Sequence, residues 1–126
     1  MTMTDERTRS IRWGGELLEA MLADASIEPE LKRKAELFMK TYPWPDIVSD
    51  WITNDFNYVP ADQAGALVGA YELFLELRRQ SGQGSKETRH HLMYVMRHFP
   101  DPSDVKHWAS EYPDTSLREW VSFERS

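Results

Sequence analysis

The amino-acid sequence predicts an all-α fold, a compact bundle of about six to seven helices in a single domain over residues 1–126. Apolar residues recur every three or four positions in several stretches, which is the spacing of one face of an α-helix. Prolines and polar, glycine-containing stretches separate these segments. Met39–Pro45 also has a near copy 57 positions later, at Met96–Pro102. This echo predicts that two similar helical units build the bundle.

The composition is that of a globular protein without covalent cross-links. Hydrophobic residues make up 40% of the 126 positions and charged residues 29%, proportions typical of a chain that buries its own core. The absence of cysteine excludes disulfides, thiolate metal ligands and a cysteine nucleophile, and it suits a reducing compartment. Residues 1–7 contain no apolar h-region of the kind found in a signal peptide, and no stretch of the sequence approaches the ~20 apolar residues that cross a bilayer. We therefore expect a cytoplasmic protein that does not enter a membrane.

Two helices are predicted in the first part of the chain. Thr4 is a candidate N-cap for a long helix over residues 5–23, since acidic residues follow it directly. Pro29 suits the first turn of a second helix, over residues 28–41. That helix is expected to end at Tyr42, because a residue that precedes a proline leaves the helical region.

The next signals predict a short third helix and then a central one. Pro45 suits the first position of the short helix, and residues 54–60 form the expected connection between two halves. The helix expected over residues 61–80 is apolar around most of its circumference, which predicts burial by neighbours on more than one side.

The rest of the chain predicts three further helical segments. Ser85 follows a glycine-rich loop and is placed to cap a helix over residues 86–98. Asp101 and Pro102 have the types expected at the N-cap and first position of another short helix. A last helical segment lies within residues 111–126. The predicted core takes in these apolar positions: Ile11, Leu18, Met21, Leu22, Leu31, Ala35, Phe38, Ala64, Leu67, Val68, Tyr71, Phe74, Leu75, Leu77, Leu92, Val95, Met96 and Phe99.

Two glycine pairs interrupt helices. Gly14 and Gly15 lie in the middle of the first helix, where they indicate a kink or a close contact. Gly65 and Gly69 share a face of the central helix four positions apart, and charged neighbours favour a packing notch within the domain over membrane dimerisation.

The echo predicts an internal repeat of a long helix, a second helix and a short helix, over residues 5–53 and 61–110. At a constant shift of 57 positions the identical pairs include Met39/Met96, Pro43/Pro100, Pro45/Pro102, Val48/Val105 and Trp51/Trp108. The alternative is that two unrelated hairpins converged on the same proline-containing stop. Two units are too few for a solenoid, so the prediction is one bundle with pseudo-twofold packing.

A resemblance covers roughly residues 1–48. The opening Met-Thr-Met-x-x-Glu-Arg-Thr-Arg, a Leu-Leu pair, an acidic Pro-Glu linker, a basic helix and Tyr-Pro are similar to a group of small uncharacterised bacterial proteins. That group carries no assigned activity or catalytic residues. The resemblance implies an accessory bacterial protein, and the second half of this chain departs from the pattern.

The sequence offers no catalytic residue, no cofactor motif and no metal site that we would select. Asp104, His107 and Glu111 have the spacing of one helix face, but a solvated, charge-paired surface explains them better. There is no His-Glu-x-x-His motif, no dinucleotide fingerprint and no phosphate-binding loop. The interpretation is a cofactor-free protein that is not an enzyme, although an enzyme of unrecognised type stays open.

The preferred function is a protein-protein interaction module, with a stoichiometric inhibitor or adaptor from accessory or phage-derived bacterial DNA as its more specific form. Aromatic residues dominate interface hot spots, so Trp13 and Trp44, which have no tryptophan counterpart in the echo, are the candidate partner-binding residues, for another protein or a second copy of this chain. Packing against the core is the competing explanation. The alternative function is nucleic-acid binding, opposed by the net charge of -6. Its candidate residues are Lys32, Arg33, Lys34, Arg78, Arg79 and Arg89.

Overall fold

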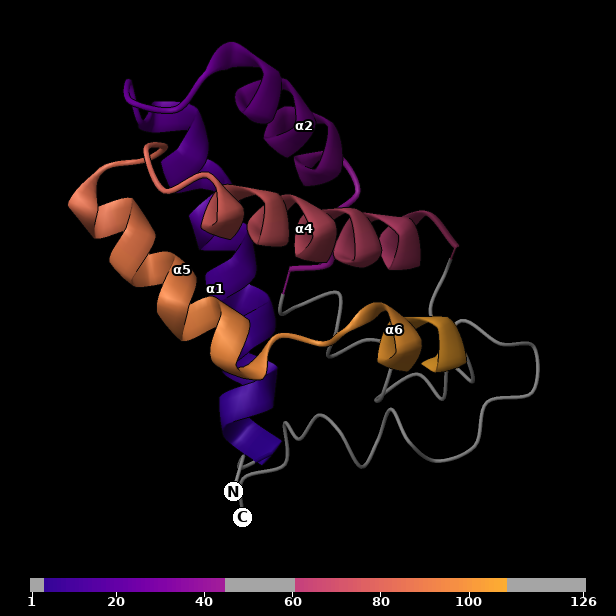
Figure 1. Ribbon diagram of the computed structural model, residues 1–126. Coiled ribbons are helices and arrows are strands. Elements are labelled where there is room, and N and C mark those ends of the chain that lie inside the picture. Colours follow the sequence, from indigo (N-terminus) through magenta and orange to yellow (C-terminus); the bar gives the residue numbers. More distant parts are fainter. Residues whose placement is uncertain (1–3, 45–60, 109–126) are drawn as a thin grey trace.

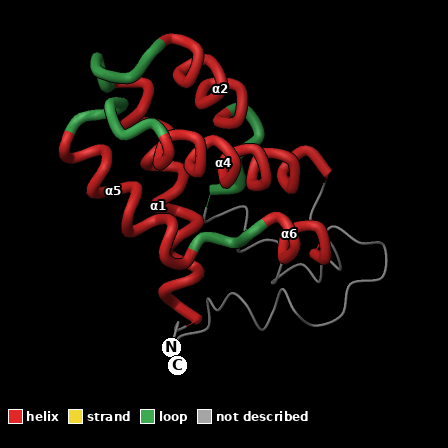
Figure 2. Tube along the Cα trace, viewed as in Figure 1, coloured by secondary structure: helices red, strands yellow, loops and turns green. Residues whose placement is uncertain are grey.

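The computed structural model describes residues 4–44 and 61–108, and every regular element in this part of the chain is an α-helix (Figures 1 and 2). The all-α prediction is therefore confirmed for these residues. The short helix expected to begin at Pro45, the connection over residues 54–60 and the segment 111–126 lie outside the described residues. The helices are α1 (Thr4–Ala23), α2 (Pro29–Met39), α4 (Ala61–Arg79), α5 (Lys86–His98) and α6 (Pro102–Trp108).

The helix boundaries follow the local signals in the sequence. Pro29 is the first residue of α2, as predicted, although the helix ends at Met39, before the expected limit of residue 41. The side chain of Ser85 caps α5, because the Thr88 backbone N–H donates to its Oγ over 3.2 Å. Asp101 acts in the same way before α6, where its carboxylate accepts from the backbone N–H of Asp104 at 2.9 Å.

The helices of the first and second halves pack across each other. Helix α1 packs against α2 and α5, whereas α4 packs against α2, α5 and α6 (Figure 1). The second helix of each half therefore lies against the long helix of the other half. Buried side chains from all of these helices join one hydrophobic cluster.

The observed core contains most of the predicted positions and adds others. Leu17 of α1 and Leu73 of α4 are fully or almost fully buried and were not among the expected residues. Leu22, Phe38, Val68, Tyr71 and Met96 are only partly buried, against the edge of the cluster. The largest fully buried side chains are Phe74, Ile11, Leu17, Leu18, Met21, Leu31, Leu67, Leu73, Leu77 and Leu92.

The glycine pair in α1 is a site of close contact. A Cβ added at Gly14 would lie 2.6 Å from the Tyr42 hydroxyl, and one at Gly15 would lie 2.7 Å from the ring of Trp44. The Tyr42 hydroxyl donates to the backbone carbonyl of Ile11, and burial raises the pKa of this hydroxyl well above its usual range. The aromatic residues that follow α2 therefore rest directly on the α1 backbone.

The glycine pair in α4 behaves differently at its two positions. The ring of Phe38, at the end of α2, occupies the space that a side chain at Gly69 would need. Gly65 is exposed, and no atom of the described residues lies within 4 Å of an added Cβ. The prediction of a close packing contact is therefore correct for Gly69 and wrong for Gly65. Phe38 of α2 lies against Gly69 and not against Gly65.

The loop between α1 and α2 contacts the loop between α4 and α5. Asp24 Oδ2 accepts hydrogen bonds from the Ser85 backbone N–H and from the Thr88 hydroxyl, each over 2.7 Å. Its Oδ1 accepts from the hydroxyl and the backbone N–H of Ser26. These hydrogen bonds hold the pKa of Asp24 well below its usual range. The largest contribution comes from the Ser26 hydroxyl, and the Ser85 N–H and the Thr88 hydroxyl add to it.

Candidate functional site

A groove of about 550 Å³ lies between α5 and the C-terminal end of α4. We call it the α5 groove. Three of its lining residues are apolar: Leu92, Met93 and Met96. The others are basic or titratable nitrogen side chains: Arg78, Lys86, Arg89, His90 and Arg97. The groove therefore combines an apolar lining with a basic border, and none of its described lining residues carries a carboxylate.

Helix α5 exposes large apolar side chains beside this groove. Leu92 and Val95 are buried against the core, as expected for one face of an amphipathic helix. Met93 and Tyr94 lie on the opposite side, with 64% and 50% of their surfaces exposed. Such side chains are of interest when they gather in one place, because contiguous exposed apolar surface marks interaction sites.

Tyr94 is held between two cationic or titratable neighbours on its own helix. The ring centroids of His90 and Tyr94 are 5.2 Å apart, and the Arg97 guanidinium carbon lies 5.8 Å from the Tyr94 ring centroid. The guanidinium contact is within the range of cation–π attraction. The aromatic ring therefore lies between two residues that line the α5 groove.

Within the part of the chain that the structure describes, the basic border of the α5 groove forms no ion pair with an acid. The ion pairs between described residues join Arg12 to Glu16, Arg33 to Glu30 and Lys34 to Glu76. None of them involves Arg78, Lys86 or Arg97. The groove is therefore a locally positive surface on a protein whose net charge is -6.

Arg89 has a structural role at the closed end of the groove. Its Nη1 donates to the carbonyl oxygens of Leu77, Gln80 and Gln83 over 3.1, 3.2 and 2.7 Å, and its Nη2 donates to that of Arg78 over 3.2 Å. These are carbonyls at the end of α4 and in the following loop, which have no partner within the helix. Arg89 therefore caps α4, and its guanidinium is already engaged.

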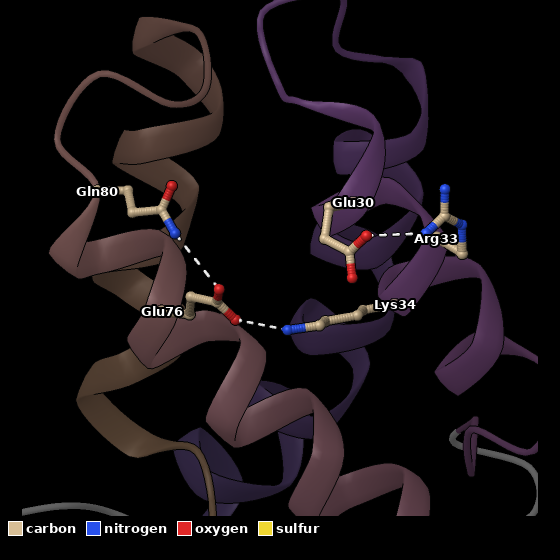
Figure 3. A network of polar contacts seen from close by, with 5 residues as sticks. All are labelled: Glu30, Arg33, Lys34, Glu76 and Gln80. Carbon is tan, nitrogen blue, oxygen red and sulfur yellow. Dashed lines mark hydrogen bonds and ion pairs between the residues drawn. The ribbon is translucent and has the colours of Figure 1, made fainter.

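Two basic residues of α2, Arg33 and Lys34, are partnered by acids (Figure 3). Arg33 Nη1 contacts Glu30 Oε1 at 2.8 Å, and Lys34 Nζ contacts Glu76 Oε1 at 3.0 Å. The other oxygen of Glu76 accepts from Gln80. Of the six nucleic-acid candidates, Arg78 and Arg89 border the α5 groove, whereas Lys32, Arg33, Lys34 and Arg79 do not line it. The structure does not gather the six into one groove.

A second hollow, of about 490 Å³, lies beside α2, and Lys32 and Arg33 line it. Four of its lining residues stand 57 positions before residues of the α5 groove. The pairs are Pro29/Lys86, Lys32/Arg89, Arg33/His90 and Glu36/Met93. The two hollows thus occupy corresponding positions on α2 and α5. They differ in that the hollow beside α2 has the acidic Glu36 at the position where the α5 groove has the apolar Met93.

The tryptophans selected from the sequence pack partly against the core. Trp44 lies on Gly15 and meets Tyr42 edge to face, with ring centroids 5.6 Å apart. Trp13 has the Arg9 guanidinium over its ring at 5.7 Å. Neither tryptophan lines the α5 groove, so the structure does not bring them together with its apolar residues.

The titratable side chains of the described residues form no evident catalytic or metal centre. No group of three or more His, Asp or Glu side chains that could hold a metal ion occurs among them. His91 is partly buried, and burial lowers its pKa against the opposing influence of the nearby Glu16 charge and the Trp13 backbone. Of Asp104, His107 and Glu111, which we interpret as a solvated helix face, the side chains of His107 and Glu111 lie outside the described residues.

Comparison with known proteins gives no family assignment: no family model matches the chain, and neither the curated proteins nor the solved structures include a significant match. Among the described helices, none combines the length and the apolar character needed to span a membrane. The α5 groove is therefore the feature on which a functional argument can be built.

Proposed function

We propose that this protein is an interaction module that binds a protein partner at the α5 groove, acting as an inhibitor or adaptor. The observation that carries the proposal is the exposure of Met93 and Tyr94 beside Arg78, Lys86 and Arg97, which form no ion pair with an acid of the described residues. Interface centres are enriched in methionine, aromatic residues and arginine, all of which meet here.

We also propose that the two hollows descend from one duplicated unit. At the shift of 57 positions the start of α1 at Thr4 corresponds to the start of α4 at Ala61, and Pro29 of α2 corresponds to Lys86 of α5. The packing of α1 on α5 and of α2 on α4 supports the same idea, since a pseudo-twofold rotation exchanges these pairs. In this proposal the α5 groove gained Met93 after duplication and became the binding copy.

The cellular setting is proposed from the sequence. The resemblance of residues 1–48 to small bacterial proteins supports an accessory bacterial role, and the absence of cysteine suits the cytoplasm. An inhibitor or adaptor of this kind requires no cofactor.

A nucleic-acid role is the second candidate, because Arg78 and Lys86 leave positive charge free at the groove. The observations favour it less. The guanidinium of Arg89 is already bound to carbonyls, Arg33 and Lys34 contact acids, and the net charge of -6 opposes approach to phosphates.

The test of the proposed function is capture from a host lysate with three versions of the tagged protein. Met93→Glu places a charge in the α5 groove, whereas Leu37→Glu makes the same kind of change on α2, at a side chain that is 58% exposed. Leu37 is also the position 57 residues before Tyr94. Both changes lie on exposed helical surface, so both variants are expected to keep the wild-type melting temperature.

The expected result is a protein captured in stoichiometric amounts by the wild type and by Leu37→Glu, and not by Met93→Glu. Mass spectrometry identifies the captured protein, and its reconstitution with the purified chain confirms direct binding. Capture of the same proteins by all three versions, or of none by the wild type, contradicts the proposal.

A further inference from the structure

We propose that the segment received by the α5 groove is an acidic amphipathic helix of the partner. This inference rests on the proposed function and names the chemistry of the partner. Its apolar side chains contact Met93, Met96 and Leu92, and its carboxylates face Lys86 and Arg97 on the border.

The charge of the groove selects an acidic occupant. Arg78, Lys86 and Arg97 line it without a carboxylate partner among the described residues, and Arg89 adds its charge while it caps α4. A basic segment would meet these charges unfavourably, because like charges brought together at an interface cost affinity. An acidic segment would break no ion pair between residues 4–44 and 61–108, since none of those pairs involves Arg78, Lys86 or Arg97.

The length of the charged border suits about three turns of helix. Lys86 and Arg97 are on the same face of α5, at the first position and near the last position of the helix. Eleven residues at 1.5 Å per residue separate them by roughly 16 Å. Met93 lies between them on that face, so acidic groups at both ends of a helical segment can meet the cations while apolar groups between them meet Met93.

The apolar lining is of the adaptable kind. Met93 is 64% exposed and Met96 is partly buried, so both thioether side chains can repack around a partner. Leu92 below them is buried and gives the lining a firm base. Surfaces that bind amphipathic helices typically contain flexible, exposed methionine side chains beside buried apolar residues.

Other occupants fit these observations less well. A small anion would require several donors converging on one point, whereas the free cations are spread along α5 and across to Arg78. A nucleic-acid strand gains most of its affinity from many phosphate contacts. Here the exposed methionine stands between the cations, and the whole protein carries a net charge of -6.

The corresponding hollow on α2 supplies an internal comparison. It has Glu36 where the α5 groove has Met93, and Pro29 where the groove has Lys86. Both differences disfavour an acidic amphipathic segment. The inference therefore places binding at α5 and not at α2.

The test uses fluorescence anisotropy of the full chain with four labelled probes. The first is a synthetic helix with leucine at positions i, i+3, i+4 and i+7 and glutamate at most others. The second has the same composition in scrambled order, the third has lysine in place of glutamate, and the fourth is a single-stranded DNA oligonucleotide. We expect the first probe to bind at least about tenfold more tightly than each of the others, because only it matches both charge and apolar spacing.

Matched variants locate the binding site. Lys86→Glu with Arg97→Glu, and separately Met93→Glu, are expected to weaken the acidic helix by about tenfold or more. Arg33→Glu on α2 with Lys40→Glu at the residue that follows this helix makes the same change in net charge and is expected to leave the affinity within about twofold. Circular dichroism checks that all variants keep their helix content.

Each contrary result has a definite meaning. Equal affinity for the ordered and scrambled acidic peptides would reduce the effect to charge alone and overturn the inference. Tighter, steeply salt-dependent binding of the oligonucleotide would assign the groove to nucleic acid. Failure of all four probes would also overturn the inference, whereas the proposed function would still be decided by whether Met93→Glu abolishes capture of the host partner.

Discussion

The carboxylate of Asp24 accepts a hydrogen bond from the backbone N–H of Ser85, which lies 61 positions further along the chain, over 2.7 Å. Ser85 in turn caps α5 through its own side chain. One acidic residue at the end of α1 thereby fixes the N-terminal end of the helix that carries the α5 groove. This contact ties the start of α5 to the end of α1, in addition to the packing of the two helices on each other.

We expect Asp24→Asn to destabilise the protein by about 1 kcal/mol near neutral pH, because the amide replaces a charged acceptor of several hydrogen bonds. The pKa of Asp24 is lowered in the folded state, so its contribution is present above the unfolded value of about 3.8 and is lost as the pH falls through the lower folded value. In urea unfolding between pH 2 and pH 7, the free energy of unfolding should therefore fall less at acidic pH for Asp24→Asn than for the wild type. Glu36→Gln, at an exposed position, is the control, and equal pH profiles for wild type and Asp24→Asn would contradict the assignment.

Arg89→Lys should destabilise the protein by about 2 kcal/mol, because one ammonium group cannot reproduce four hydrogen bonds from a planar guanidinium. Hydrogen exchange should also become faster at the end of α4 and in the following loop. Arg79→Lys, on exposed surface, is the matched control and should have little effect. If both variants have wild-type stability, the capping role is wrong.

Gly69→Ala and Gly65→Ala should change the free energy of unfolding in opposite directions. The added methyl group at Gly69 collides with the ring of Phe38, so we expect a loss of about 1–3 kcal/mol. The same change at Gly65 meets no neighbour and should stabilise α4 by about 0.5–1 kcal/mol, since alanine has the higher helix propensity. Thermal unfolding of the two variants measures the difference, and a stabilised Gly69→Ala protein would show that α2 does not rest on α4 at this point.

Trp44→Ala tests the competing roles of this tryptophan. Because its ring packs on Gly15 and Tyr42, we expect a loss of about 2 kcal/mol in the free energy of unfolding, smaller than for a fully buried tryptophan. Light scattering should give the same molecular mass for variant and wild type. A lower mass with unchanged stability would instead assign Trp44 to an interface between copies of the chain.

Much of the helical framework could be predicted because its signals are local. Pro29, Ser85 and Asp101 each act on backbone groups within one turn, so their residue types alone place the beginnings of α2, α5 and α6. Gly65 and Gly69 show the limit of such reasoning. Their spacing is identical to that of a packing notch, but which of them meets a neighbour depends on where α2 crosses α4.

The candidate site could not be predicted for a related reason. From the sequence alone, Met93 and Tyr94 look like ordinary apolar residues of a helix. The structure shows that Leu92 and Val95 are buried and that Met93 and Tyr94 are exposed on the other side of α5. The signal that could have indicated this exposed pair is that Met93 and Tyr94 are apolar although they lie on the polar side of the helical pattern. Charge posed a similar difficulty, since Lys34 meets Glu76 from 42 positions away, a partner that sequence spacing does not reveal.

The crossed packing of the helices has a consequence for how the chain holds together. Since α1 lies on α5 and α2 lies on α4, each half of the described chain covers apolar surface that belongs to the other. Separation of the halves would open both of these contacts at once and return their apolar faces to water. We therefore expect the described helices to unfold together in a single cooperative transition, and we expect neither half to keep its structure as an isolated fragment.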